Sequence, residues 1–107
     1  MATSREFFEF IAEQLSALDG VSFRPMMGDY IVYCRGKVVG GIYDDRLLVK
    51  PTDSAKKLMP DANYEIPYDG AKPMLAVPDV DDKDFLAELL SAIAAELPEP
   101  KKKSLNK

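Results

Sequence analysis

Residues 21–50 read VSFRPMMGDYIVYCRGKVVGGIYDDRLLVK, and this stretch decides the fold. It is rich in β-branched and aromatic residues, which favour strands, and turn-forming residues interrupt it at short intervals. Arg35-Gly36-Lys37 and Asp44-Asp45 are typical of tight turns, because glycine and aspartate adopt turn conformations readily. The stretch therefore predicts an antiparallel meander of three or four strands. Pro25 lacks a backbone donor, which places the first strand at an edge or in an irregular segment.

Helical patterns lie on both sides of this meander. Apolar residues recur at helical spacing over residues 4–18, and Thr3 with Glu6 matches a capping box at the start. The most regular helical stripe runs from Phe85 to Leu97. Acidic residues precede it, and carboxylates at a helix N-terminus interact favourably with the helix dipole. These acids therefore need no metal or substrate to account for them.

The segment between the meander and the last helix predicts three short elements. Residues 52–59 indicate a short helix that ends before Pro60, and residues 64–68 and 73–77 indicate two short strands around Asp69-Gly70. The predicted order is helix, three or four strands, short helix, two strands, long helix. Strands grouped apart from helices favour an α+β fold, with an antiparallel sheet of about five strands and the helices on one face.

Length and charge define one small domain. The chain has 107 residues with 47% hydrophobic and 30% charged residues, which predicts a single domain over residues 1–100. Residues 101–107 contain four lysines and no acid, and we expect a basic, disordered tail there. The remaining 10 basic and 18 acidic residues give residues 1–100 a formal net charge of −8. This acidic body does not favour direct contact with nucleic acid.

Residue types that are missing exclude several functions. The sequence contains no histidine, which excludes Ser-His-Asp triads, Cys-His dyads and histidine-bound zinc within one chain. Cys34 is the single cysteine, so an internal disulfide is impossible and a reducing cytoplasm is expected. The sequence shows neither a signal peptide nor an apolar run long enough to cross a membrane. We expect no enzyme activity, no cofactor and no metal.

Both faces of the predicted sheet are apolar. Strict alternation places Tyr30, Val32 and Cys34 on one face and Ile31 and Tyr33 on the other. Helices in a two-layer domain cover one face only, so the second needs another cover. This cover is a symmetric partner, a different protein or irregular segments of the chain itself. We expect a homodimer, with a candidate interaction surface formed by Tyr30, Val32, Cys34, Val38, Ile42 and Leu48.

A second set of side chains could contact a small ligand or an anion. This alternative is a ligand-binding domain or modest enzyme with a cleft beside the sheet, formed by Arg24, Tyr33, Tyr43, Arg46 and Lys50. Arg46 and Lys50 share a strand face, which is either an anion-binding strip or a solvated surface. Arg35 beside Cys34 could activate the thiol, but a buried structural cysteine fits the sequence equally. Gly36, Gly40 and Gly41 match no phosphate-loop spacing and indicate turns or close backbone approach.

Three segments resemble a known family. RPMMGDYIVY at residues 24–33 and GKVVGGIYDDRLLVK at residues 36–50 are similar to the TfoX (Sxy) N-terminal domain family, as is PYDGAKPM at residues 67–74. The resemblance implies a fold similar to secretion-chaperone-like α+β domains, which often form dimers. It also implies a role beside transcription: named members regulate natural competence together with the cyclic-AMP-responsive activator. We therefore expect a non-enzymatic regulatory or adaptor domain that acts through protein contacts.

Overall fold

Three two-residue turns shape the first half of the domain. In the computed structural model, which describes residues 3–98, Met27-Gly28, Arg35-Gly36 and Asp44-Asp45 all have positive φ at both positions, between 52° and 91°. Positive φ at both central residues is the condition of a type I′ turn, whose twist matches that of the flanking strands. The turns join four strands into the predicted meander: β1 (Val21–Met26), β2 (Asp29–Cys34), β3 (Lys37–Ile42) and β4 (Leu47–Val49).

Two further strands extend the sheet beyond the meander. β5 (Tyr64–Glu65) and β6 (Met74–Ala76) pair with each other, and β6 pairs with β4, all antiparallel. The sheet therefore has six strands in the order β1-β2-β3-β4-β6-β5, which agrees with the predicted three or four strands before the short helix and two after it. β1 lies at an edge, as Pro25 indicated. The two strands predicted around Asp69-Gly70 are shorter than expected, because Ile66 to Pro73 form a loop instead.

The three helices begin at side chains that accept hydrogen bonds from backbone amides. They are α1 (Arg5–Gln14), α2 (Asp53–Leu58) and α3 (Lys83–Glu96), capped by Ser4, Thr52 and Asp82 respectively. α1 is shorter than the predicted 4–18, and its cap is Ser4 rather than Thr3. The Thr3 hydroxyl instead donates a hydrogen bond of 2.8 Å to the Asp29 carboxylate, which fastens the start of the chain to the β1–β2 hairpin.

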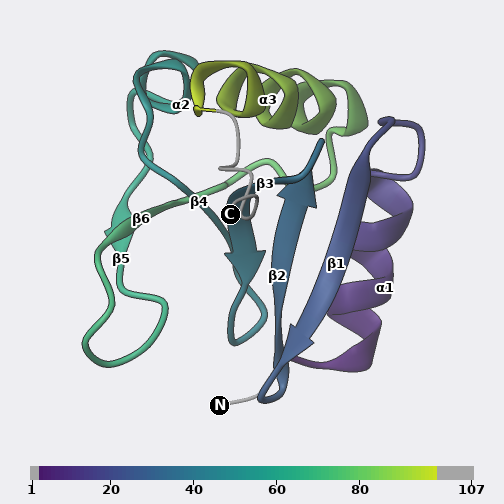
Figure 1. Cartoon of the computed structure of the whole chain (residues 1–107). Helices are drawn as coiled ribbons and strands as arrows, with labels where there is room; N and C mark the ends of the chain where they lie inside the picture. Colours follow the sequence, from purple (N-terminus) through teal and green to yellow (C-terminus); the bar gives the residue numbers. More distant parts are fainter. Residues whose placement is uncertain (1–2, 99–107) are drawn as a thin grey trace, which may run out of the picture.

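The helices cover one face of the sheet and leave the other free (Figure 1). The core between the two layers includes Val32 and Ile42 from the sheet, Ile11 from α1 and Leu86 and Leu90 from α3, all completely buried. This burial confirms the predicted α+β fold. Among residues 3–98, no helix is long and apolar enough to cross a membrane. The predicted tail, residues 101–107, lies outside the described residues.

A β-bulge changes which residues face the core. In the pairing of β2 with β3, Val32 lies opposite Gly40 but Tyr33 lies opposite Val38, so Val39 is the extra residue. Val39 enters the core, whereas Val38 shares the helix-free face with Tyr33. Strict alternation placed Val38 with Ile42, and this prediction was wrong because a bulge shifts the alternation by one residue.

The end of α3 is tied to the start of α2 by a carboxylate. The backbone N–H groups of Ser54 and Asp53 donate hydrogen bonds of 2.8 Å and 3.1 Å to the two oxygens of Glu96. The Ser54 N–H above all, and then the other donors at the start of α2, lower the pKa of Glu96 below its ordinary 4.5. These bonds need the ionised carboxylate.

We expect Glu96→Gln to reduce stability at neutral pH and to have little effect in acid. A carboxylate whose pKa is lower in the folded chain than in the unfolded chain stabilises the fold at pH values above its unfolded-state pKa, here 4.5. This stabilisation is lost as the pH falls through the pKa of the folded state. Melting temperatures of both proteins across this range test the expectation. The exposed Glu88 of the same helix, changed to glutamine, is the matched control. A difference between wild type and Glu96→Gln that does not shrink in acid would contradict it.

Candidate functional site

Tyr43 forms the floor of a groove on the helix-free face. It follows β3 directly, and its side chain folds back over Gly41, where a Cβ atom would lie 2.4 Å from the tyrosine ring. Only glycine allows the ring to lie this close to the strand. Tyr43 is 7% exposed, and Leu48, also on this face, is completely buried. Part of the helix-free face is therefore covered by the chain itself.

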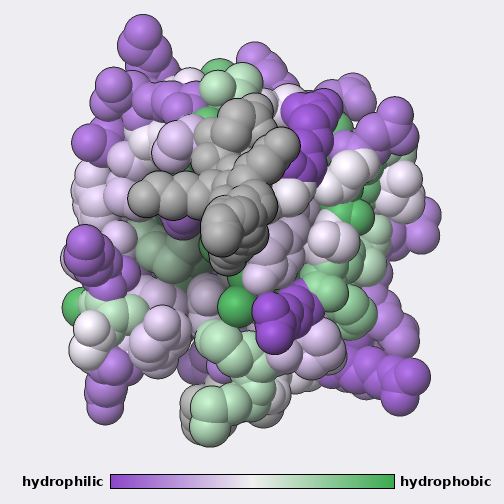
Figure 2. Space-filling model, in the orientation of Figure 1, coloured by the Kyte–Doolittle hydropathy of each residue, from purple (hydrophilic) through white to green (hydrophobic). Residues whose placement is uncertain are grey.

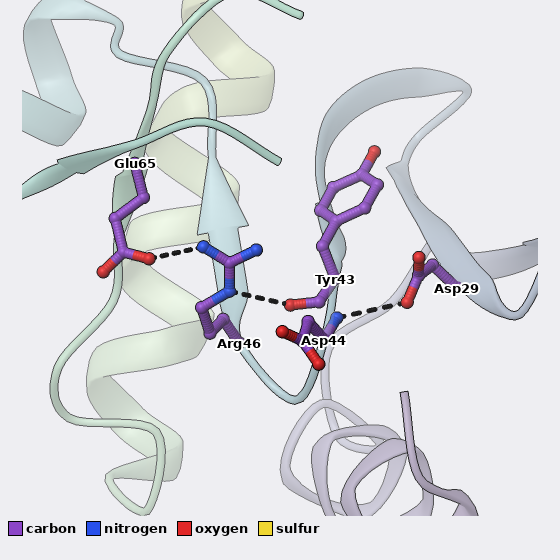
Figure 3. A network of polar contacts seen from close by, with 5 residues as sticks. All are labelled: Asp29, Tyr43, Asp44, Arg46 and Glu65. Carbon is purple, nitrogen blue, oxygen red and sulfur yellow. Dashed lines mark hydrogen bonds and ion pairs between the residues drawn. The ribbon is translucent and has the colours of Figure 1, made fainter. Parts of the chain in front are cut away.

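Arg46 fastens the two sides of this groove together. Its Nε donates a hydrogen bond of 3.0 Å to the Tyr43 carbonyl oxygen, and its guanidinium forms an ion pair with Glu65 of β5 (Figure 3). The Asp44 N–H donates a hydrogen bond of 3.1 Å to Asp29, so the same turn is also tied to β2. The position of Tyr43 relative to the loop after β5 is thus set by charge-assisted hydrogen bonds.

Two recesses meet at the Tyr43 ring. The first has a volume of about 370 Å³ and lies between Tyr43, the connection from β4 to α2, and the loop of residues 66–73; its lining is Tyr43, Lys50, Pro51, Thr52, Pro67, Tyr68, Ala71, Lys72, Pro73 and Met74. The second, about 390 Å³, is lined by Met26, Met27, Asp29, Tyr43 and Tyr68. Both recesses are lined by Tyr43 and Tyr68, whose ring centroids are 5.9 Å apart, so they adjoin at this pair of rings; together they are here called the tyrosine groove.

The tyrosine groove offers apolar contact with few polar groups. Rings, prolines and Met74 make up most of the first recess, and Lys50 and Lys72 are its charged side chains. Burial above all, and then the neighbouring Tyr68 and Asp29, raises the pKa of Tyr43 above its ordinary value of 10. Its hydroxyl is therefore protonated at neutral pH and can donate a hydrogen bond to a ligand. It does not serve as a base there.

The five side chains expected to contact a ligand do not all come together. Tyr43 and Lys50 both line the first recess. Arg46 lies next to Tyr43, but its guanidinium is engaged by Glu65 and the Tyr43 carbonyl, so it acts as a support of the groove. Arg24 and Tyr33 lie on β1 and β2 and line neither recess, because these strands contribute only residues next to their hairpin turn, Met26 and Asp29, to the second one. The expected Arg/Tyr cleft is thus replaced by a tyrosine and lysine groove.

The six residues expected to form an interaction surface lie mostly inside the molecule. Val32, Cys34 and Ile42 are completely buried beneath the helices, and Leu48 is completely buried on the opposite face. Tyr30 is half-buried and stacks on Phe8 of α1, with ring centroids 3.9 Å apart. Val38 alone is partly exposed on the helix-free face. Alternation correctly placed Tyr30, Val32 and Cys34 on the same face of the sheet. That face is covered by the helices, so these residues form part of the core side and not an exposed interaction surface.

Cys34 does not have the surroundings of a reactive thiol. It is completely buried in the core. Burial raises the pKa of the thiol above its ordinary value of 9.0, and the nearby cations Arg35 and Lys37 offset this only in part. Lys37 also donates hydrogen bonds to the carbonyls of Ala94 and Leu97 at the end of α3, where a cation is favourable. These observations favour the structural interpretation of Cys34.

Much of the groove lining was missed by sequence reasoning. Tyr68, Lys72 and Met74 come from a loop and a short strand that carry no helical or alternating pattern. The available signal was the segment PYDGAKPM itself, because Tyr68 is an aromatic residue among prolines and glycine with no predicted core position. Tyr68 is 55% exposed, which agrees with that signal.

Figure 2 shows the helix-free face, with hydrophilic residues around its border and hydrophobic and hydrophilic residues mixed across it. A sheet covered by helices on one side and carrying a groove on the other defines a two-layer α+β domain. More particularly, the chain belongs to the TfoX N-terminal domain family, whose model matches residues 13–94. This confirms the resemblance seen in the three sequence segments.

One relative covers nearly the whole chain. It is described as an uncharacterized 12.7 kDa protein in the 5′ region of trpE, from Spirochaeta aurantia, and is 35% identical over 102 residues. The matched region spans 94% of this chain and 89% of the relative. No solved structure matches the chain. The description of the relative names no function, so the function is argued from the groove.

We expect Arg46→Ala to lower the free energy of unfolding by about 1–2 kcal/mol, because it removes a charge-assisted hydrogen bond and leaves a half-buried Glu65 without its partner. Arg5→Ala is the matched control, since Arg5 forms a fully exposed pair with Glu9 on α1 and should cost no more than about 0.5 kcal/mol. Urea denaturation measures both values. Equal losses in the two variants would show that Arg46 does not brace the groove.

Proposed function

We propose that this domain is a non-enzymatic regulatory or adaptor module that holds a segment of a partner protein in the tyrosine groove. The observation that carries the proposal is that two recesses adjoin at one pair of tyrosines. Two recesses joined at Tyr43 and Tyr68 make an elongated apolar surface, which suits an extended segment better than a compact ligand. Aromatic residues and methionine, which line much of it, are enriched in protein interfaces.

Exposed apolar side chains continue the groove at its margins. Ile66 is 53% exposed at the start of the loop, and Met27 is 98% exposed at the tip of the β1–β2 hairpin. Met27 also has a φ of 52°, a conformation in which asparagine or glycine is more stable. Neither packing nor backbone preference explains methionine there. Contact with a partner explains the methionine at position 27, because a flexible thioether side chain adapts to many surfaces.

The chemistry of the groove supports binding rather than catalysis. Its ionisable groups among the described residues are two lysines, the tyrosines Tyr43 and Tyr68, and Asp29, one of whose oxygens accepts hydrogen bonds from Thr3 and Asp44. Cys34, the chain's single thiol, lies on the opposite face of the sheet, so within residues 3–98 no thiol with an adjacent base lines the groove.

The family supports placing this binding activity in regulation. Named TfoX proteins act beside a transcriptional activator, and we infer a regulatory protein as the partner of this domain, in the cytoplasm. The net charge of −8 over residues 1–100 disfavours direct contact with DNA. The domain would therefore influence transcription through another protein.

A photoreactive amino acid placed at Tyr68 tests the proposed function. We expect Tyr68→p-benzoylphenylalanine to form a covalent product with one protein in the native cell, because this side chain is 55% exposed in the groove. The same replacement at Phe10, 40% exposed on α1, is the control and should not give that product. Identical products from both positions would contradict groove binding. A small molecule found with the purified domain, displaced by Tyr68→Ser, would favour the alternative of a ligand-binding domain.

We also propose that the domain forms a homodimer. Ile31, Tyr33 and Val38 are partly exposed on the helix-free face of β2 and β3, and none of them lines either recess of the groove. A symmetric partner is a common cover for such a face.

Light scattering at micromolar concentration should give twice the mass of the chain, and Val38→Asp should reduce it to the monomer mass, because a carboxylate would be buried at the interface. Asp44→Asn, at an exposed turn, is expected to leave the mass unchanged. A monomer mass for the wild type would overturn the dimer.

A further inference from the structure

The tyrosine groove has different charges at its two ends. Lys50 and Lys72 line the first recess, and no aspartate or glutamate among residues 3–98 joins them there. Asp29 lines the second, where the described part of the chain contributes no lysine or arginine. An occupant that crosses Tyr43 and Tyr68 therefore meets cations at one end and a carboxylate at the other.

The two lysines are available to a ligand. Neither ammonium group forms an ion pair or hydrogen bond with any residue of the described part of the chain, whereas Arg46 is paired with Glu65 and Lys83 with Glu13. Lys50 is half-buried and Lys72 is exposed. Because Lys50 is half-buried among apolar side chains of the recess, its attraction for an anion is screened less than that of a fully exposed lysine.

We propose that the groove recognises an extended acidic peptide segment whose carboxylates lie between Lys50 and Lys72 and whose apolar side chains lie over Tyr43 and Tyr68. This inference rests on the proposed function and adds the chemistry and direction of the partner segment. Asp29 repels carboxylates from the second recess, so the acidic residues lie at the α2 end and the apolar residues continue toward Met27.

The charge of the whole domain sharpens this choice. An acidic body repels most acidic peptides. A segment with scattered carboxylates therefore gains little binding free energy at the two lysines and loses binding free energy through repulsion elsewhere on the domain. A segment with its carboxylates grouped at one end avoids this repulsion. Recognition thus depends on the pattern of charge along the peptide as well as on its sign.

Selection from a displayed library of random peptides tests the inference with the full chain. We expect enriched peptides to carry aspartate or glutamate on one side of an apolar or aromatic centre. Synthetic versions should bind Lys50→Gln/Lys72→Gln about tenfold more weakly, which corresponds to about 1.4 kcal/mol. The control Lys56→Gln/Lys57→Gln removes the same charge from exposed positions on α2 and should leave binding unchanged.

The outcomes separate this inference from the proposed function. Peptides that need Tyr68 but carry neutral or basic residues in place of the acids would overturn the inference and leave the groove as a binding site. Equal weakening by both lysine pairs would also overturn it, because the attraction would then be unspecific. A selection that yields no peptide whose binding is lost in Tyr68→Ser would overturn the proposed function itself. Circular dichroism of each variant shows whether the fold is kept.

Discussion

Positive φ at both central residues of three successive turns is the constraint on which the rest of the domain depends. Each turn has only two residues, so it fixes the register of the strand residues next to it. With β1 to β4 fixed in this way, one face of the sheet meets α1 and α3 and the other remains without helices. The turn at Asp44-Asp45 also shapes the groove, because it places Tyr43 and Arg46 opposite each other at the end of the β3–β4 hairpin. The groove is therefore a product of the turn that closes β3 onto β4.

The elements that follow strong local patterns could be predicted from the sequence. The meander, the edge position of β1, α2 and α3 all have patterns that depend on near neighbours in the chain. No local pattern predicts the β-bulge at Val39, because Val38 and Val39 are the same residue type. Packing in the folded domain determines which of the two enters the core. The same holds for Ser4 and Thr3: both can cap a helix, and the Asp29 carboxylate on a distant hairpin determines which one does.

The candidate site was predictable only where its residues belong to the meander. Tyr43 and Lys50 follow strands that alternation detects, and both line the groove. Arg46 was expected to meet a ligand, but Glu65 lies within reach after folding and neutralises it. The remaining lining comes from the loop of residues 66–73, whose position depends on β6 pairing with β4 far along the chain. Long-range pairing of this kind leaves little trace in local composition.

Gly41 has a consequence for how sequences of this domain can vary. Its missing side chain is the space that the Tyr43 ring occupies, so the two positions share one volume. A larger residue at position 41 would lift the ring and make the groove shallower, unless a smaller residue replaced the tyrosine. We therefore expect positions 41 and 43 to change together among relatives that keep the groove. The depth of the groove at its centre then depends on both residues together, which lie two positions apart in the chain, and not on either one alone.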